Sequence, residues 1–492
     1  MLSKSKIVRG LQCQKSLWLY KHRYDLREVS DQQQAIFESG TNVGILAQQL
    51  FPNGADAQQD EPYPNFQVIK NTQAYLKMAS KVIYEATFIY NDVLVAIDIL
   101  VRREDGWHGY EVKSTNSVKD PHITDAAIQY HVIKGAGIDL KDISIITFDG
   151  DYVRKGELDV HQLFKATNVT EEVLAKQDEL PLIIEELKQV QAQVSEPDIE
   201  IGPHCSDPYT CDFCAYCWKE IPEYSVFNLT QARGKQWELY ERGIELIENI
   251  PFDISLSDAQ QIQRDAELTG KPYINQDGIA NFLQTITYPI YHFDFETIMP
   301  AVPMFDNSRT YQQIPFQYSV HIQQEPGGEC DHREYLASSD GADPREELIK
   351  AMLKDLGTEG TILAYHSSFE ISRINELARD FPQYREQLEA LIPRVKDLEI
   401  PFRRKYYYTK EMQGRSSIKK VLPALIPELS YSDLEIQEGG TASSTFLAMT
   451  QGTFEGDIEE TRRALLEYCK MDTRAMVEIL YNLKTTFFNK TF

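Results

Sequence analysis

Residues 291–297 read YHFDFET, and the other informative segments in the second half of the chain are interpreted as partners of this stretch. Aromatic and acidic residues alternate along it, which predicts a strand. Because strand side chains alternate between faces, we expect Asp294 and Glu296 on one face, while Phe293 and Phe295 enter the core. Two carboxylates on one rigid strand can hold a divalent metal, although a solvated strand face would show the same spacing.

Residues 361–370, TILAYHSSFE, form the first downstream partner of this strand. An apolar strand passes through polar turn residues into a helix, for which Ser367 or Ser368 is a natural N-cap. Glu370 is therefore expected in the first turn of that helix. The helix carries a buried stripe at helical spacing, formed by Ile371, Ile374, Leu377 and Ala378.

The second partner is a helical run from Asp457 to about Leu483. Tyr468 and Asp472 are four positions apart in this run, so they share one helix face. A carboxylate within an apolar stripe needs a partner, and a metal ion would supply one. The three segments together predict a metal centre whose acids come from distant parts of the chain.

The order and spacing of five residues resemble the DnaQ-like (DEDDy) 3′ to 5′ exonucleases of the ribonuclease H-like fold: Asp294, Glu296, Glu370, Tyr468 and Asp472. The resemblance implies that the four acids hold Mg²⁺ or Mn²⁺ and that the tyrosine orients the attacking water. Two positions depart from the family, because His366 stands where many members carry Asn and Glu370 stands where most carry Asp.

Several further stretches within roughly residues 225–492 resemble one bacterial family of domains of unassigned function, which is placed with these exonucleases. The stretches that carry this resemblance are DFET at 294–297, PFQYS at 315–319, SIKKVLP at 417–423 and GGTA at 439–442.

The first half of the chain contains a second series of elements, in the order helix, three strands, helix and strand. Turn residues at 91–92 and 104–106 separate the strands, which predicts a meander. The expected elements are a helix near 71–80, strands at Lys81–Tyr90, Val93–Arg102 and Trp107–Lys113, a helix at Ile123–Gly135 and a strand at Ile143–Phe148. Beyond this series, residues from about 151 to 194 read as helices, and further helices are expected at Gln231–Ile250 and Leu256–Leu268.

Three polar residues within this series suggest a hydrolytic centre. Glu111 and Lys113 share one face of their strand, and Asp98 on the neighbouring strand can reach the same spot. Two carboxylates can bind Mg²⁺ or Mn²⁺, and a lysine can stabilise an attacking hydroxide or the developing phosphorane charge. The plainer alternative is a surface salt bridge between Glu111 and Lys113.

This arrangement resembles the PD-(D/E)XK nuclease core, in particular its RecB-like branch. The resemblance implies metal ligands at Asp98 and Glu111 and a catalytic lysine at Lys113. Gln129 in the following helix matches the glutamine of that branch, whereas the usual tyrosine four residues later is Ile133 here.

Two further features of the RecB-like branch lack a clear match. Whether Tyr130 replaces the missing tyrosine stays open. No counterpart is visible for the first-helix histidine that many members use as an extra ligand, although Glu85 on the first strand could serve.

Seven cysteines, an odd number, do not fit the disulfide framework of a secreted protein. Four of them lie within thirteen residues: Cys205, Cys211, Cys214 and Cys217. This spacing predicts a metal or cluster site in a reducing compartment, and four local cysteines could bind Zn²⁺. Cys330 and Cys469 are expected to be ordinary buried thiols.

The chain also resembles RecB-like nucleases that carry one cysteine ahead of the nuclease core and three after it. This resemblance implies a [4Fe-4S] cluster held by Cys13, Cys205, Cys211 and Cys217. Cys214 would then be the spare thiol, but the near spacing departs from the usual pattern and leaves its identity open. The cluster would hold the two ends of the first domain together and carry out no redox chemistry.

With 492 residues, the chain is too long for one ordinary core, and its 42% hydrophobic and 25% charged residues are typical of a globular protein. We expect an α/β (α+β) architecture in which a restriction-endonuclease-like core precedes a ribonuclease H-like exonuclease domain. No run of 18 apolar residues and no signal-peptide core is visible, so we expect no membrane association and a cytoplasmic location. The expected parts are a RecB-like PD-(D/E)XK domain at 1–220, a helical connector at 221–283 and a DnaQ-like domain at 284–492.

The resemblances imply a metal-dependent nuclease, with a 3′ to 5′ exonuclease in the second half and another nuclease site in the first. The alternatives are a nucleic-acid-binding clamp that serves a single exonuclease, and a non-catalytic assembly protein. A role in repair, phage defence or nucleic-acid turnover follows from resemblance alone.

The formal charge of −25 argues against broad binding to duplex nucleic acid. Single-stranded or frayed ends are the expected substrate, with DNA and RNA not distinguished. Residues 403–410, RRKYYYTK, mix cations with aromatic residues as single-strand binding surfaces do, or else form a solvated loop with one ring in the core.

Overall fold

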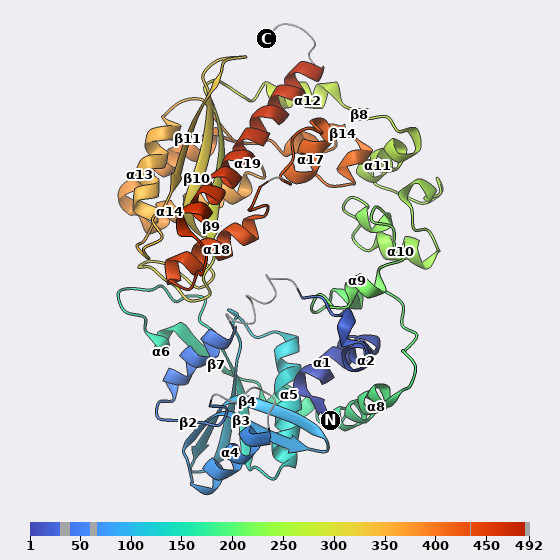
Figure 1. The fold of residues 1–492 in the computed structure, drawn as a ribbon, viewed down its shortest axis with the longest axis vertical. Helices are drawn as coiled ribbons and strands as arrows, with labels where there is room; N and C mark the ends of the chain where they lie inside the picture. Colours follow the sequence, from blue (N-terminus) through green and yellow to red (C-terminus); the bar gives the residue numbers. More distant parts are fainter. Residues whose placement is uncertain (30–39, 60–65, 433, 488–492) are drawn as a thin grey trace. The chain divides into compact units, whose positions relative to one another are not determined.

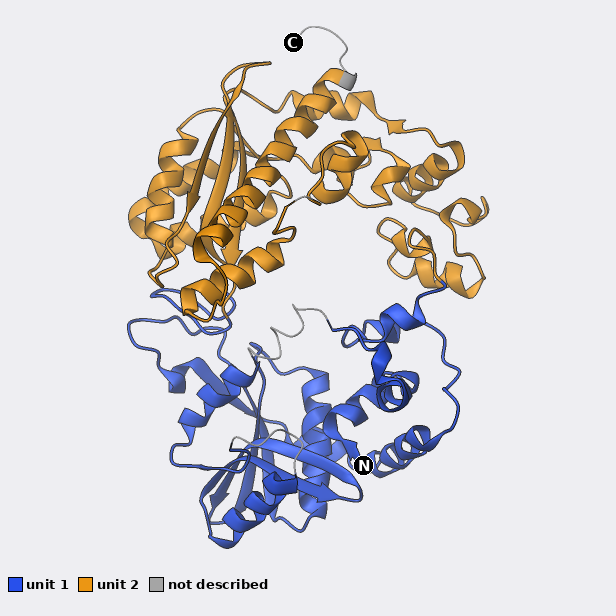
Figure 2. Ribbon diagram, in the orientation of Figure 1, with its two compact units in different colours: residues 1–220, 301–312 blue, residues 221–300, 313–492 orange. Residues whose placement is uncertain are grey.

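A computed structural model describes residues 1–29, 40–59, 66–432 and 434–487. It is a mixed α/β protein that divides into two compact units (Figure 2). Unit 1 comprises residues 1–220 and 301–312, and unit 2 comprises residues 221–300 and 313–492. The expected connector at 221–283 is thus part of unit 2, and a short segment from the expected third part belongs to unit 1. None of the described helices has the length and apolar character needed to cross a membrane.

Unit 1 is built on a seven-stranded sheet with the order β2-β3-β4-β5-β6-β7, in which β1 also pairs with β4. β3, β4 and β5 form the expected antiparallel meander, and β6 runs parallel to β5. The strands are β1 (Leu2–Ser3), β2 (Ala55–Asp56), β3 (Val82–Tyr90), β4 (Val93–Arg103), β5 (Gly106–Val112), β6 (Leu140–Phe148) and β7 (Phe164–Asn168).

Helices cover this sheet and enclose the core of unit 1 (Figure 1). The crossover helix α5 (Asp120–Gly135) packs on β3, β4 and β6, while α1 (Lys4–Gln12) packs on α5, α2 (Gln14–His22) and α8 (Leu180–Ala192). Other helices of this unit are α4 (Phe66–Lys77), α6 (Val160–Leu163), α7 (Thr170–Ala175) and α9 (Cys214–Cys217).

Residues 151–194 contain a strand where the sequence predicts only helices. β7 pairs antiparallel with β6, and the Phe164 ring stacks on Phe148 with centroids 5.4 Å apart. A five-residue strand at a sheet edge is too short to show a clear alternation. Its strand conformation is therefore set by the partner strand and not by its own sequence.

Residues 301–312 complete unit 1. Arg154 donates hydrogen bonds to the carbonyls of Pro303 and Met304, at 3.0 and 2.8 Å. The Tyr311 ring lies edge-on to Phe148, and its hydroxyl contacts Ser114. The sequence gives no sign that this segment belongs with the first half of the chain.

Unit 2 contains a mixed five-stranded sheet with the order β11-β10-β9-β12-β13. β9, β10 and β11 are antiparallel neighbours, whereas β12 runs parallel to both β9 and β13. The strands are β9 (Ile290–Ile298), β10 (Ile314–Gln323), β11 (Cys330–Leu336), β12 (Thr361–Ala364) and β13 (Val395–Asp397).

The two faces of this sheet carry different residues. Phe293 and Phe295 are buried in a core with residues of α13 (Arg345–Leu356) and α14 (Ser368–Asp380), as the alternation predicts. The long helix α19 (Ile458–Phe487) packs on β9 and β10 (Figure 1). Other helices of this unit are α15 (Arg385–Leu391), α16 (Ile400–Arg403), α17 (Ile418–Leu425) and α18 (Gly439–Gln451).

The segment 221–283 is less helical than its sequence suggests. The helix expected at Gln231–Ile250 is reduced to α10 (Lys235–Glu241), because Gly243 adopts a positive φ of 73° and turns the chain. The helix expected at Leu256–Leu268 is present as α11 (Asp258–Thr269), and α12 (Gln276–Leu283) follows. A two-stranded sheet joins β8 (Tyr273–Ile274) to β14 (Tyr407–Tyr408).

Candidate metal centres

The structure brings the five candidate residues of unit 2 to one cleft, which has a volume of about 370 Å³. Asp294 and Glu296 lie on β9, and Glu370 lies in the first turn of α14, directly after β12. Because β12 is parallel to β9 and adjacent to it, their carboxyl ends meet at the same edge of the sheet. Tyr468 and Asp472 reach the cleft from α19.

The four carboxylates of this cleft are crowded and largely withdrawn from water. Burial raises the pKa of Asp294 well above its ordinary value, and Asp472, Glu296 and Glu370 raise it further. Burial also raises the pKa of Glu296 and of Glu370 to about 8, and that of Asp472 to about 6. Such a cluster is stabilised either by protons or by a cation.

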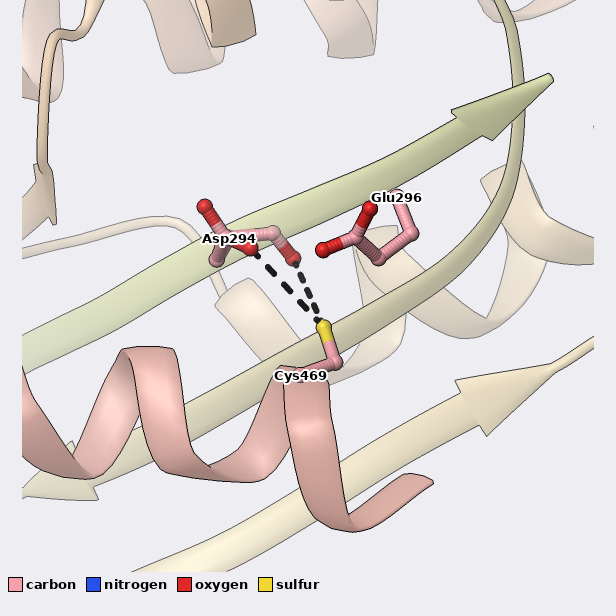
Figure 3. Close-up of side chains that lie close together, drawn as sticks. All are labelled: Asp294, Glu296 and Cys469. Atoms are coloured by element: carbon pink, nitrogen blue, oxygen red, sulfur yellow. Dashed lines mark hydrogen bonds between the residues drawn. The ribbon is translucent and has the colours of Figure 1, made fainter. Parts of the chain in front are cut away.

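Two of the four acids, Asp294 and Glu296, lie close enough together to bind one divalent metal ion. Ligand atoms of Asp294, Glu296 and Cys469 all lie within 4.8 Å of one another (Figure 3). Glu370 is only 2% exposed, and its Oε2 has no hydrogen-bond partner among the described residues. Carboxylate oxygens are the ligands that Mg²⁺ and Mn²⁺ prefer, so a bound cation would satisfy this buried oxygen.

Cys469 is a buried thiol, as expected, but it lies against the acid cluster. Its Sγ is 3.9 Å from both the backbone oxygen and Oδ2 of Asp294 (Figure 3). Burial and the neighbouring carboxylates raise the pKa of this thiol well above its usual range. Cys469 is therefore a protonated sulfur that donates to Asp294 behind the cleft.

Two tyrosines and a lysine complete the site. Burial and Asp472 raise the pKa of Tyr468, so its hydroxyl stays protonated and can donate a hydrogen bond. Tyr431 donates to Oδ1 of Asp472 at 2.7 Å. Lys419 Nζ lies 5.3 and 5.5 Å from the ring centroids of Tyr468 and Tyr431. Sequence reasoning missed Tyr431, because it lies in an irregular segment between α17 and α18 where no periodicity marks it.

His366 lies at the rim of the same cleft. It adopts a positive φ of 66°, and its backbone N–H donates to Oδ1 of Asp397 at 3.0 Å. Its Nδ1 is 2.9 Å from Oε2 of Glu399, which also accepts from Arg403 at 3.2 Å. His366, which the sequence marks only as a departure from the family pattern, is thus held in a fixed orientation.

The RRKYYYTK tract does not present three aromatic rings to solvent. Tyr407 and Tyr408 form β14 and are 9% and 0% exposed, and Lys405 is 2% exposed. Tyr406 is half-buried, and Arg403 and Arg404 are exposed. Neither interpretation of the tract fits, because two of its rings are buried: Tyr407 packs edge-on against Phe402, and the Tyr408 hydroxyl lies 3.3 Å from that of Tyr224.

In unit 1, the structure brings Asp98, Glu111 and Lys113 together on adjacent antiparallel strands. Lys113 Nζ donates to Oε1 of Glu111 at 2.9 Å and also contacts Asp125. The Val112 backbone N–H donates to Oδ2 of Asp98 at 2.5 Å. Glu111 is only 2% exposed, so the pair is not the surface salt bridge of the plainer alternative.

Fixed cations dominate the electrostatics of this second centre. Burial alone would raise the pKa of Glu111, but Lys113, Lys4 and the Gln129 amide outweigh it and lower that pKa to about 2. Burial and Glu111 raise the pKa of Asp98 to about 7. Burial and then Asp98 raise the pKa of Glu85 to about 8, which shows that Glu85 faces the same centre.

Glu85 reaches this position through an irregularity in β3. Its φ is +52°, and it falls between the register pairs Tyr84–Ile99 and Ala86–Ile97. A positive φ is unusual for a residue with a side chain and indicates local strain. Strained backbone of this kind clusters at functional sites.

Two further side chains bind the Glu111 carboxylate. Lys4 Nζ, from the first residue of α1, lies 2.5 Å from Oε1. The Gln129 amide donates to Oε2 and, at 2.7 Å, to the Ala96 carbonyl. Sequence reasoning identified Gln129 but missed Lys4, which no pattern relates to a strand 107 positions away.

The structure also settles where Tyr130 and Ile133 lie. Both are buried in the apolar core of unit 1, at 9% and 0% exposure. Asp139 is the only charged residue that affects the pKa of Tyr130. Tyr130 therefore does not take the place of the missing tyrosine beside Asp98 and Glu111.

Five cysteines line one cavity of unit 1, namely Cys13, Cys205, Cys211, Cys214 and Cys217. Cys13 is the residue between α1 and α2, and Gln12 beside it donates to the carbonyls of His204 and Tyr209 at 2.8 and 2.6 Å. Hydrogen bonding with Cys214, and to a smaller extent with Ser16, lowers the pKa of Cys211 to about 6. Thiols from two distant segments of the chain thus line one cavity.

Comparison with known proteins identifies relatives without describing their activity. Residues 291–417 match the family described as "Domain of unknown function (DUF2779)", a span that contains Asp294, Glu296 and Glu370 but ends before Tyr468. "Uncharacterized protein UU173" of Ureaplasma parvum is 26% identical over 298 residues, which cover 54% of this chain and 42% of that protein. "Uncharacterized protein MG366 homolog" of Mycoplasma pneumoniae is 28% identical over 205 residues, covering 38% of this chain and 31% of that protein. The chain spans less than half the length of these curated relatives.

Proposed function

We propose that the protein is a metal-dependent nuclease whose unit 2 is a DnaQ-like 3′ to 5′ exonuclease. One observation carries this proposal: Asp294, Glu296, Glu370 and Asp472 converge on one cleft together with Tyr468, although they lie on three separate segments. Their raised pKa values and the unsatisfied Glu370 oxygen favour a bound cation. The mixed sheet that supports them is compatible with the ribonuclease H-like fold expected from the sequence.

The roles of the residues follow from their chemistry. Asp294, Glu296 and Asp472 would hold one ion, and Asp294 and Glu370 would support a second. When bound, Mg²⁺ or Mn²⁺ supplies charge stabilisation and a water of lowered pKa. Tyr468 keeps its proton, so it donates to the attacking water or to a phosphate oxygen and does not act as a base.

Surrounding residues suit the end of a nucleic-acid strand. Lys419 lines the cleft and brings an ammonium group toward a phosphate. Phe369 lines it as well, and an aromatic ring at this position can stack on a base. We therefore propose an unpaired terminus of DNA or RNA as the substrate.

Digestion of end-labelled single- and double-stranded DNA and RNA with Mn²⁺ tests this proposal. We expect the wild-type protein to release mononucleotides from the 3′ end, and Asp294→Ala to lose this activity while staying folded. Asp331→Ala, at a solvent-exposed site on β11, is the matched control and is expected to digest normally. Undiminished 3′ digestion by Asp294→Ala would remove the assignment.

For unit 1 we propose a RecB-like PD-(D/E)XK domain with a second metal-dependent site at Asp98, Glu111 and Lys113. Lys113 is held by Glu111 and Asp125, where its charge could stabilise a phosphorane. The expected result is a second nuclease activity that survives Asp294→Ala and is lost in Lys113→Ala.

The alternative, in which unit 1 is a nucleic-acid clamp without catalysis, is supported by the donors around Glu111. Both oxygens of this carboxylate already accept hydrogen bonds from side chains of the protein. If no variant cuts nucleic acid except through unit 2, the clamp describes unit 1 better.

The cysteine cavity supports the proposal of a structural [4Fe-4S] cluster bound by Cys13, Cys205, Cys211 and Cys217, with Zn²⁺ as the alternative. The visible absorption spectrum of protein purified without air distinguishes the two.

A further inference from the structure

The Glu111 carboxylate is surrounded by donors that belong to the protein. Oε1 accepts from two ammonium groups, Lys4 at 2.5 Å and Lys113 at 2.9 Å, and Oε2 accepts from Gln129. By contrast, none of the four carboxylates of the unit 2 cleft forms an ion pair with a described residue. A divalent ion that uses Glu111 must therefore share or displace a cation that is already there.

The two lysines are not held equally. Lys113 lies two residues after Glu111 and is also paired with Asp125. Lys4 comes from α1, and Glu111 is its one ion-pair partner among the described residues. The Lys4 side chain is 23% exposed, so its flexible stem has a path into solvent. Lys4 is the cation that can leave Glu111 while Lys113 stays in place.

The backbone that carries Lys4 is fixed, so its ammonium is delivered to the centre by the fold. Leu2 and Ser3 form β1, which pairs with Val93 and Leu94 at the start of β4. Further along α1, Arg9 forms an ion pair with Asp212, next to the cysteine cavity. The helix is thereby anchored on both sides of residue 4.

We propose that the Lys4 ammonium is a built-in cation that competes with the divalent ion for Glu111, so that the charge at residue 4 sets the metal affinity of the unit 1 centre. Lys4 and Lys113 already share Oε1, and a divalent ion added to them would bring a third cation whose repulsion is strong at this degree of burial. Metal binding therefore requires Lys4 to swing toward solvent, and an empty centre is neutralised without metal. This inference rests on the proposed second metal site of unit 1.

Manganese titration of the full-length protein tests the proposal. An Asp294→Asn/Asp472→Asn background weakens metal binding in unit 2, and Mn²⁺ avoids the cysteine site because it prefers oxygen ligands. In this background we expect Lys4→Met to bind Mn²⁺ about tenfold more tightly than the parent, as measured from the electron paramagnetic resonance signal of free Mn²⁺. Lys6→Met, on the same helix and without an ion pair to any described residue, is the matched control and is expected to leave the affinity unchanged.

Two further variants keep the outcomes distinct. Lys4→Gln is expected to follow Lys4→Met, and circular dichroism checks that both variants are folded. Tighter binding that disappears when Glu111→Gln is added supports competition at this carboxylate. Equal Mn²⁺ affinity of the parent and both Lys4 variants, with binding still dependent on Glu111, would overturn the competition alone. Binding that never depends on Glu111 would overturn the inference together with the proposed second site.

Discussion

The two acidic centres solve the same electrostatic problem in opposite ways. In unit 1, Glu111 is neutralised by Lys4 and Lys113, and its pKa falls to about 2. In unit 2, no described cation pairs with the acids, and the pKa of Glu296 rises to about 8. The first arrangement is stable without metal, whereas the second stores carboxylate repulsion that only protons or metal ions relieve. The difference suggests that unit 2 is the stronger metal site.

The largest expected effect separates the two centres by activity. Asp294→Asn is expected to lower Mn²⁺-dependent 3′ to 5′ digestion by more than about 100-fold, since losing even a residue that only supports a metal ligand costs about 10–100-fold. Lys113→Met is expected to leave that activity within about twofold of wild type, since Lys113 belongs to unit 1. Initial rates on a 5′-labelled single strand measure both variants. Equal losses of digestion rate in Asp294→Asn and Lys113→Met would contradict the assignment of this activity to unit 2 alone.

A smaller effect tests the roles of two tyrosines in the unit 2 cleft. Tyr468→Phe is expected to lower kcat by about 100-fold, because it removes the hydroxyl placed to donate to water or phosphate. Tyr431→Phe is expected to cost about tenfold and to weaken Mn²⁺ dependence, because its hydroxyl holds Asp472. Rates measured over a range of Mn²⁺ concentrations separate these effects. A larger loss for Tyr431→Phe than for Tyr468→Phe would reverse the assigned roles.

The cysteine cavity predicts a change in stability confined to unit 1. Cys13→Ser removes a proposed ligand that would join α1 to residues 205–217, and the binding energy of a structural metal site is folding energy. Hydrogen exchange in residues 2–22 is expected to increase, while β9 and β10 keep their protection. Cys330→Ser, on β11, is the matched control and should change neither region. Unchanged exchange in Cys13→Ser would show that Cys13 holds no metal group.

The subtlest effect is a pH dependence of opposite sign for Glu111 of unit 1 and for the acids of unit 2. Glu296 and Glu370 have pKa values of about 8 in the folded protein, above the ordinary 4.5. Their protonated forms favour folding, so stability is greatest below pH 4.5 and falls as the pH rises toward 8. Glu111, at about 2, contributes stability above pH 4.5 that is lost as the pH falls toward 2.

Mn²⁺ replaces the protons of the unit 2 acids, so the rise in Tm that it causes is expected to be larger at pH 8.5 than at pH 6. Thermal unfolding with and without Mn²⁺ measures this rise. Glu296→Gln should flatten its dependence on pH, whereas Glu111→Gln should not. A rise in Tm that is the same at both pH values in the wild-type protein would contradict the raised pKa values.

The structure shows which parts of each site could be read from the sequence. The strand alternation placed Asp294 and Glu296 on the face opposite Phe293 and Phe295, and the helical spacing placed Tyr468 beside Asp472. The strand order in unit 1 correctly placed Asp98 near Glu111 on the neighbouring strand. Failures came where local patterns are weak, as in the short edge strand β7 and in the tract whose rings Tyr407 and Tyr408 are buried.

Within one helix or strand, the sequence by itself determined the direction of each side chain, because the backbone repeat fixes it. Only the tertiary structure decided which elements meet: Lys4 with Glu111, Tyr431 with Asp472, and Cys13 with the distant cysteines. These contacts depend on the packing of the whole chain, which no local repeat encodes. The sequence thus shows which groups each element carries, and the fold decides which carboxylates pair with a lysine and which have no ion-pair partner among the described residues.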